Sequence, residues 1–224
     1  MVYYNQRNYK HIPYPSQALP NATVASGGCG VCSASMVIEN LLKCPFAPQK
    51  SAEFSIKNGG RVNGGTDMSK LSKALCCSFP LKFSVSSDIK TVASKVKNGA
   101  MAIAHAKGGT KGLFSTSGHF VVLAEYKDGI FTVLDPYLYN GKYNTEYRRN
   151  KATLKGNYLY VSTDNVACDC TKYYIFERNE KAMTVEEAKQ IIKNKAGLSD
   201  GTINFLYAYR FGDDLLIKLA KAMQ

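Results

Sequence analysis

The chain has 224 residues, of which 45% are hydrophobic and 21% are charged. This composition excludes a globally disordered chain, and the length suits one domain with an appendage or two small domains. The net charge of +12 favours polyanionic partners such as an anionic cell wall. The basic residues are scattered, however, and the densest cluster, at residues 148–151, is too short for a nucleic-acid arm, so no nucleic-acid partner is expected.

The seven cysteines do not have the pattern of a disulfide framework. Their number is odd and several lie too close together for ordinary intrachain bridges, which suits synthesis in a reducing compartment. No spacing completes a recognisable zinc site, so neither a metal nor another cofactor is expected. Residues 1–7 lack the apolar segment of a signal peptide, and no apolar run is long enough to span a membrane.

The first half of the chain is predicted to be mainly helical. Ala34, Val37, Ile38 and Leu41 recur at the helical period, which predicts a buried helix over residues 31–42. Proline, glycine and capping residues delimit the other elements. These are an irregular arm over 1–28 with one short strand at its start, a loop with a short helix over 45–66, a helix from Thr66 or Asp67 through Cys76, a strand over 79–85 and a helix over 89–97.

The second half changes to the two-residue period of strands. Residues 108–118 form a glycine-rich loop, and Asp128-Gly129 is a hairpin signal between two apolar runs. A helical first half followed by an antiparallel sheet predicts an α+β fold. The predicted strands cover 100–105, 119–126, 130–135, 158–161 and 173–176.

The last forty or so residues read as a separate helical module. Thr184 and Glu187 form a capping box that opens a helix ending at Gly197, and two further helices follow, the last starting at Asp213. So short a segment is near the lower limit for independent folding. We therefore expect a domain over 1–180 and a module over 181–224 that packs on it, targets the cell wall or self-associates.

The stretch around Cys29 is a candidate nucleophilic site. Gly28-Cys29-Gly30 precedes the predicted helix, and a thiol at a helix N-terminus is stabilised as the thiolate by free N–H groups and the helix dipole. The two glycines are expected to leave the sulfur uncrowded. Cys29 and Cys32 also form a C-x-x-C pair, which favours a thiol–disulfide redox protein as an alternative.

His119 and Asp135 are candidate partners of this thiol. His119 starts one strand of the hairpin and Asp135 ends the other, so the two side chains can be neighbours although they lie 16 residues apart. A carboxylate there can accept the Nδ1–H of the imidazole and orient Nε2 towards the nucleophile. A nucleophile, a base and an orienting acid in the order Cys, His, Asp predict acyl transfer by a thiolate.

These motifs resemble the papain-like cysteine peptidases, in particular the branch of the bacteriocin-processing (double-glycine leader) peptidase domains. The shared motifs are Gly28-Cys29-Gly30 with Met36, residues 118–123 (Gly-His-Phe-Val-Val-Leu) and Asp135-Pro136. The resemblance covers roughly residues 1–177. Members of this branch carry an upstream glutamine that holds the oxyanion; Gln6, within Tyr4-Asn5-Gln6, matches it better than its rival Gln17. Cys32 departs from the family pattern, as a core residue or as the partner of Cys29 in an inactivating disulfide.

The resemblance implies a papain-like fold and peptide hydrolysis with Cys29 as nucleophile, His119 as base and acid, Asp135 as orienter and Gln6 as oxyanion stabiliser. The basic charge and the small C-terminal module favour a phage-type endolysin that cuts amide bonds in peptidoglycan peptides. Such a protein is expected to be made in the cytoplasm and released to the wall by a separate pore protein, with anionic wall polymers as further partners. An intracellular protein-processing peptidase is the alternative.

Overall fold

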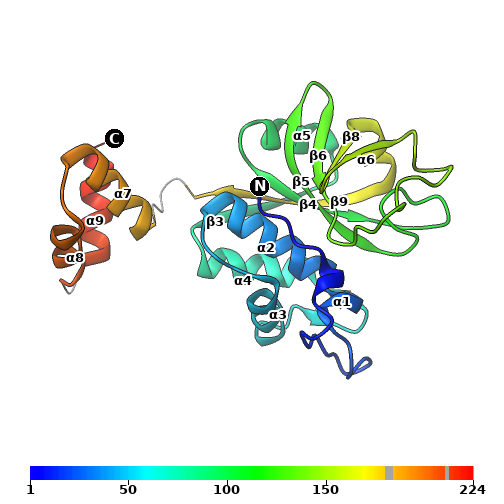
Figure 1. The fold of residues 1–224 in the computed structure, drawn as a ribbon, viewed down its shortest axis with the longest axis horizontal. Helices are drawn as coiled ribbons and strands as arrows, with labels where there is room; N and C mark the ends of the chain where they lie inside the picture. Colours follow the sequence, from blue (N-terminus) through cyan, green and yellow to red (C-terminus); the bar gives the residue numbers. More distant parts are fainter. Residues whose placement is uncertain (180–183, 210–211, 224) are drawn as a thin grey trace. The chain divides into compact units, whose positions relative to one another are not determined.

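The computed structural model describes residues 1–179, 184–209 and 212–223. It divides into two compact units, Met1–Arg178 and Asn179–Gln224, each with a core of its own (Figure 1). The boundary expected at residue 180 falls within 180–183, outside the described residues.

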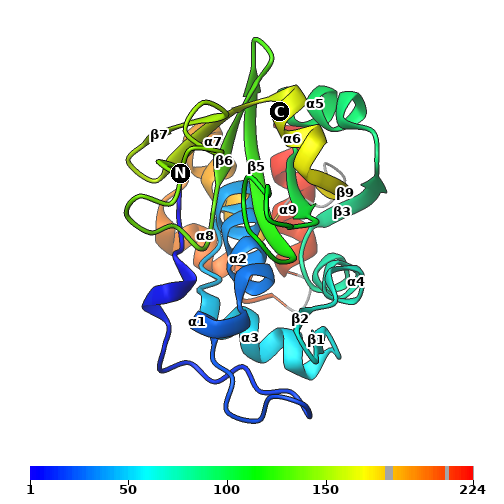
Figure 2. The ribbon, with the colours of Figure 1, turned by 90° about the vertical axis from the view of Figure 1, so that its right-hand side faces the viewer.

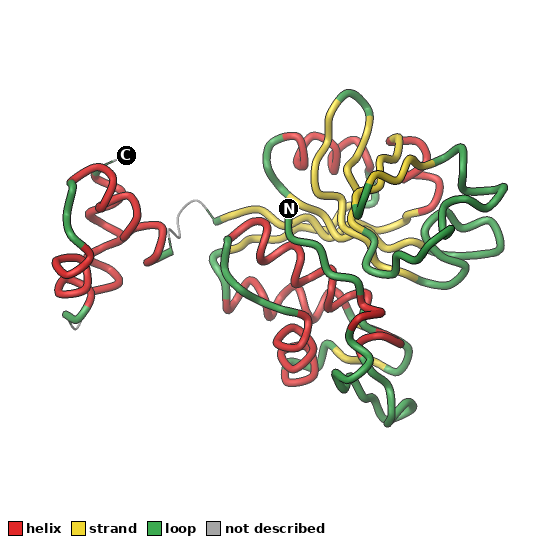
Figure 3. Tube along the Cα trace, in the orientation of Figure 1, coloured by secondary structure: helices red, strands yellow, loops and turns green. Residues whose placement is uncertain are grey.

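The first unit is built on an antiparallel sheet of seven strands, in the order β3-β9-β4-β5-β6-β8-β7. The chain's α+β character is therefore confirmed, since helices precede the sheet and cover it (Figure 3). The strands are β3 (Leu81–Ser86), β4 (Met101–Ala106), β5 (His119–Lys127), β6 (Ile130–Leu134), β7 (Ala152–Lys155), β8 (Tyr158–Ser162) and β9 (Cys170–Arg178).

Helices lie on both faces of this sheet. On one side are α2, α3 and α4, and on the other are α5 and α6 (Figure 1). A small hairpin of β1 and β2 stands beside the first group (Figure 2). The bounds are η1 (Gln6–Asn8), α1 (Val24–Gly27), α2 (Cys29–Leu42), α3 (Pro48–Lys57), β1 (Arg61–Val62), β2 (Gly65–Thr66), α4 (Met68–Ser78), α5 (Ile89–Lys97) and α6 (Thr163–Asp169).

Strand β4 shows how the sequence builds two cores around one sheet. Met101 and Ile103 join the cluster beneath α2, whereas Ala102 and Ala104 join the cluster beneath α5. Successive side chains of a strand point to opposite faces, so a strand covered on both sides is apolar at every position. Small alanines on the α5 side leave room for that helix to pack closely.

The central helix α2 packs against the sheet. It packs on β5, and its residues Ala34, Val37 and Ile38 are fully buried, as the helical spacing predicts. The helix ends at Leu42, and Lys43 caps it in the left-handed conformation with φ 56°. The N-terminal end of α2 carries Cys29.

Local capping explains where the structure differs from the predicted elements. The short strand expected at the start of the arm is replaced by the turn η1, because the Asn5 side chain accepts the Arg7 N–H at 3.1 Å and draws the backbone into a helical turn. The helix α6 was not predicted, although Ser162 caps it by accepting the Asn165 N–H at 3.3 Å.

The second unit consists of α7 (Val185–Ala196), α8 (Asp200–Tyr207) and α9 (Gly212–Ala222). The predicted capping box is present, with the Glu187 carboxylate accepting the Thr184 N–H at 3.1 Å. Gly197 ends α7 with φ 66°. The small core of this unit consists of Ala188, Ile192, Ile203, Leu216 and Ala220. Within the described parts of both units, every helix is too short or too polar to cross a membrane.

Candidate active site

Cys29 is the first residue of α2 and is half-buried. Gly28, its N-cap, separates α2 from α1, and a Cβ at Gly28 would lie 2.5 Å from the Val24 carbonyl oxygen. A Cβ at Gly30 would lie 2.6 Å from the Cβ of Thr66. Both glycines are thus required by contacts within the protein itself, which allow the start of α2 to pack against α1 and β2.

His119 and Asp135 meet as the hairpin predicts. His119 opens β5, Asp135 follows the last residue of β6, and Nε2 of the ring lies 2.8 Å from Oδ1 of the carboxylate. Both residues are almost completely buried, with 5% and 1% of their surfaces exposed. A buried pair of this kind holds the ring in one orientation and one tautomer.

The two ring nitrogens have the opposite roles from those expected. Asp135 takes Nε2, so Nδ1 is the nitrogen left for the thiol. The cause is the position of Cys29, whose sulfur also meets the backbone N–H groups of Phe120 and Gly30. A sulfur close to the β5 backbone lies on the side of the imidazole that carries Nδ1, whereas Asp135 reaches the outer nitrogen from β6.

The electrostatics of the site favour a thiolate–imidazolium pair. Burial raises the pKa of the Cys29 thiol, but the contact with His119 and the two backbone N–H groups outweigh it, so the pKa lies below its ordinary value. Burial lowers the pKa of His119, but Asp135 and then Cys29 more than compensate and raise it to about 9. Both shifts favour the state in which a charged ring lies beside a charged sulfur.

Asp135 accepts hydrogen bonds from three further groups that the sequence did not predict. Its Oδ1 also accepts the Tyr137 N–H at 2.9 Å, and its Oδ2 accepts Lys142 Nζ at 2.5 Å and the Tyr143 hydroxyl at 2.6 Å. Burial raises the pKa of Asp135, but His119 and Lys142 hold it well below its usual range. Lys142 is itself only 2% exposed, so the anion and the cation are buried together.

Gln6 lies beside the turn that leads into Cys29. It is buried, its backbone N–H donates to the Pro136 carbonyl at 2.7 Å, and its Nε2 donates to the Ala25 carbonyl in α1 at 2.9 Å. These bonds tie the N-terminal arm to both halves of the site. The Gln6 Oε1 has no partner among the described residues. The rival Gln17 is exposed and belongs to the loop of the arm.

Cys32 belongs to the core of the first unit. It is fully buried, both it and Cys29 are free thiols, and burial raises the pKa of Cys32. A thiol in this position is a poor nucleophile and a poor partner in disulfide exchange.

A small aromatic surface adjoins the histidine. The ring of Tyr137 lies edge-on to His119 with centroids 6.5 Å apart, and Tyr137 and Tyr139 remain 40% and 38% exposed. The Arg7 guanidinium lies within 6 Å of the centres of both tyrosine rings.

In the described chain, no group of three or more histidine, cysteine or acidic side chains is placed to hold a metal ion.

Comparison with known proteins gives a family but no curated relative. Residues 2–166 match the model of the Peptidase_C39 like family. A search of curated proteins finds no match. Among solved structures, the chain is similar to one described as a double glycine motif protease from an AMS/PCAT transporter in complex with the leader peptide, at 16% identity and a TM-score of 0.42, over 67% of this chain and 84% of that one.

The family match spans most of the first unit, from the arm that carries Gln6 to the helix α6. It therefore includes Cys29, the His119 hairpin and Asp135, and it agrees with a papain-like architecture of an N-terminal helix against an antiparallel sheet. The chain belongs to the Peptidase_C39 like family and is a cysteine peptidase.

Proposed function

We propose that Cys29, His119, Asp135 and Gln6 are the catalytic residues of this peptidase, and that it hydrolyses amide bonds in the peptides of bacterial peptidoglycan. The observation that carries the catalytic assignment is the series of contacts from the half-buried Cys29 thiol through the buried His119 ring to the buried Asp135 carboxylate. Nucleophile, base and orienting acid are the minimum set for covalent catalysis of acyl transfer.

The reaction proceeds in two steps through a thioester. The Cys29 thiolate attacks the scissile carbonyl carbon, and the His119 imidazolium gives its proton to the departing amine as the C–N bond breaks. Water then attacks the thioester, His119 accepts a proton from it, and the C–S bond breaks to restore the thiolate. Asp135 stays ionised throughout and keeps the ring aligned, since its pKa lies far below neutrality.

The oxyanion is assigned to the backbone N–H of Cys29 and the side-chain amide of Gln6. The first lies at the N-terminus of α2, where the helix leaves N–H groups without intrahelical partners. The second lies beside α1, one turn before Cys29. Hydrogen-bond donors that are already in position before the reaction stabilise the negative charge that develops on the carbonyl oxygen, and they need no reorganisation.

Charge and surface support the wall as the substrate. A net charge of +12 draws the enzyme towards an anionic polymer network. The exposed Tyr137 and Tyr139 and the Arg7 cation offer stacking and carboxylate pairing next to His119. On this proposal the protein acts like an endolysin, released to the wall by a separate pore protein, and residues 181–224 bind the wall or self-associate.

The test is digestion of purified Gram-positive cell walls by the wild-type chain and by Cys29→Ser. We expect clearing by the wild type alone, and mass spectrometry of the products should show new amino and carboxyl ends on stem or cross-bridge peptides. Clearing by both proteins would remove Cys29 from its role. Absence of clearing over a broad panel of walls, with cleavage of unrelated peptides retained, would refute the wall substrate and favour an intracellular protein substrate.

The redox alternative predicts a different dependence on the histidine. Thiol–disulfide exchange through Cys29 and Cys32 should survive His119→Ala, whereas peptide hydrolysis should not. We expect His119→Ala to abolish hydrolysis, and an unchanged reductase activity on a model disulfide would contradict the assignment.

A further inference from the structure

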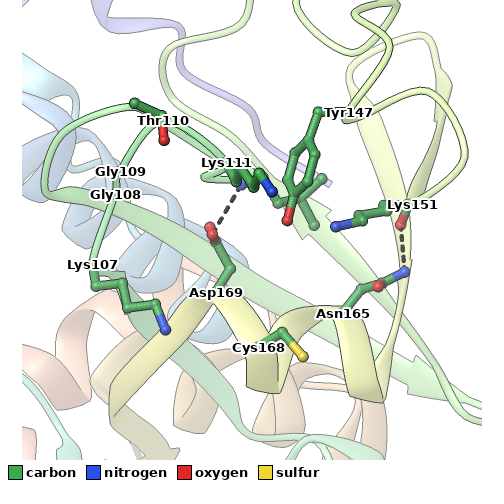
Figure 4. A pocket seen from close by; sticks show the side chains of 11 residues that line it. Lys107, Gly108, Gly109, Thr110, Lys111, Tyr147, Lys151, Asn165, Cys168 and Asp169 are labelled. Carbon is green, nitrogen blue, oxygen red and sulfur yellow. Dashed lines mark hydrogen bonds between the residues drawn. The ribbon is translucent and has the colours of Figure 1, made fainter.

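A pocket of the first unit is lined by amino groups and shares no lining residue with the proposed catalytic site. It has a volume of about 350 Å³ and lies between the loop after β4, the segment leading to β7, and α6. Figure 4 shows the polar ends of Lys111, from the loop after β4, and of Tyr147 and Lys151, from the segment leading to β7, pointing into the same space. Its other lining residues are Lys107, Gly108, Gly109, Thr110, Leu113, Asn165, Cys168 and Asp169.

The cations of this pocket are not neutralised by the protein. Among the described residues, none of Lys107, Lys111 and Lys151 lies within ion-pair distance of a carboxylate. Lys151 Nζ lies 3.6 Å from the centre of the Tyr147 ring, so this cation is held over the ring and is half-buried. The pocket is thus lined by three positively charged side chains, and no carboxylate in the described parts of the chain forms an ion pair with any of them.

Asp169 is the acidic side chain of the pocket, and it is already engaged. Its two carboxylate oxygens accept the backbone N–H groups of Leu113 at 2.8 Å and Phe114 at 3.0 Å. These bonds fix the loop and spread the negative charge over two donors. Three lysines against one aspartate leave the pocket with a net positive charge, which predicts an anionic ligand.

The donors suit a phosphate group. Ammonium groups bind phosphate as point charges from several directions, and here they come from different segments and are joined by a phenolic hydroxyl. Gly108 and Gly109 add a stretch of backbone without side chains at the pocket wall. At Gly108, which has φ 78°, a Cβ would lie 2.4 Å from the Ser117 carbonyl carbon, so the two ends of the loop are closely packed.

The loop that forms this wall also leads into the catalytic histidine. Residues 107–118 connect β4 to β5, and Gly109 N–H donates to the Thr116 carbonyl at 2.9 Å, which closes the loop on itself. Ala106, before the loop, pairs with His119, directly after it. The loop that lines the pocket is therefore joined directly to the strand end that carries His119.

We propose that this pocket binds the phosphate group of a phosphodiester-linked polyol polymer of the cell wall, and so anchors the catalytic unit to its substrate. The phosphate chemistry follows from the pocket alone, while the source of the phosphate rests on the proposed function. Anchoring by several weak contacts to a repeating polymer raises the local enzyme concentration without a tight single site.

The first test uses inorganic phosphate and the full-length chain labelled with ¹⁵N, at constant ionic strength with chloride as the reference salt. We expect saturable shifts of the amide signals of Gly108, Gly109 and Lys111. The double variant Lys111→Gln/Lys151→Gln should lose them. Its matched control, Lys50→Gln/Lys73→Gln, removes the same charge from exposed positions on α3 and α4 and should keep them.

The second test uses purified polyglycerol phosphate and, as a competing polyanion, single-stranded DNA. We expect the Lys111/Lys151 pair to weaken binding of the polyol phosphate by about tenfold or more, and to lower its salt dependence by roughly one unit of slope per lysine. The control pair should change affinity less than twofold. Cleavage of a soluble uncharged peptide should be the same in wild type and in both double variants.

Several outcomes would overturn the proposal. Phosphate shifts that do not saturate, or that fall elsewhere on the protein, would exclude the pocket. Equal losses of polyol phosphate affinity in the two double variants would mean that net charge alone causes the binding. An affinity for single-stranded DNA equal to that for the polyol phosphate would exclude a site for the polyol polymer. Failure to clear cell walls with intact phosphate binding would refute the wall substrate and leave the pocket standing, so the two proposals fail separately.

Discussion

Substitution of Asp135 by asparagine tests the network around His119, the proposed catalytic base. The carboxylate accepts bonds from four donors, two on each oxygen. An amide has a single acceptor oxygen, so its NH₂ group must face either His119 and the Tyr137 N–H, or Lys142 and the Tyr143 hydroxyl. In both orientations donors meet donors, and Lys142, which is 2% exposed, becomes a buried cation without an anion.

The expected cost is large on the scale of a single domain. Breaking a buried ion pair by removing one partner costs about 3–5 kcal/mol, against a total stability of about 5–15 kcal/mol. Urea unfolding should therefore show the midpoint of Asp135→Asn far below that of the wild type. Asp135→Asn/Lys142→Met removes the stranded cation together with its partner, and should recover much of the loss.

The same substitution should change the pH dependence of activity. Asp135 is the chief cause that raises the pKa of His119 to about 9, so its loss should move the alkaline limb of kcat/KM to lower pH. Linkage gives the matching signs for stability. The raised pKa of His119 stabilises the fold fully below its unfolded value near 6.5, and that contribution is lost as pH rises through about 9. The depressed pKa of Asp135 stabilises the fold at pH values above the unfolded pKa of the carboxyl group. This contribution to stability is lost as the pH falls towards the folded pKa.

A stability within about 1 kcal/mol of the wild type, together with an unmoved alkaline limb, would refute this reasoning. The unfolding measurement and the pH profile test separate points. The variant Asp135→Asn/Lys142→Met should regain stability, while the alkaline limb of its kcat/KM profile should stay at the lower pH. Regained stability with a wild-type pH profile would show that Asp135 does not act through His119.

Three further predictions follow from the same geometry. Gln6→Ala should lower kcat by roughly 10²–10³ with little change in KM, and an equal loss in KM would point to substrate binding instead. Gly30→Ala should destabilise the first unit by about 1–3 kcal/mol, because its Cβ would lie 2.6 Å from that of Thr66, and an unchanged denaturation midpoint would contradict this packing. Cys32→Ala should retain peptidase activity, and loss of hydrolysis in a folded variant would return the C-x-x-C pair to consideration.

Periodicity and capping explain how much of the fold could be predicted. The helix α5 (Ile89–Lys97) has its predicted bounds because Asp88 caps it and Gly99 ends it, both strong local signals. The β5–β6 hairpin follows from Asp128-Gly129, whose positive φ values of 49° and 83° form the turn. The hairpin also places the start of β5 beside the end of β6, and so brings His119 near Asp135.

The remaining parts of the site depend on contacts that have no local signal. Lys142 and Tyr143 lie in an irregular loop, and nothing in their spacing from Asp135 marks them as buried. The choice of ring nitrogen at His119 depends on how α2 docks on β5, which is a tertiary property. Gly30 is required by Thr66, a residue 36 positions away that only the folded chain brings near.

The most direct measurement of the central claim is the rate of Cys29 alkylation by iodoacetamide as a function of pH, in the wild type and in His119→Ala. Wild-type Cys29 should react as a thiolate at pH values below the ordinary thiol pKa, because His119 stabilises the charged sulfur. In His119→Ala the pH profile should move up to or beyond that of an ordinary thiol. Identical profiles in the two proteins would contradict the account.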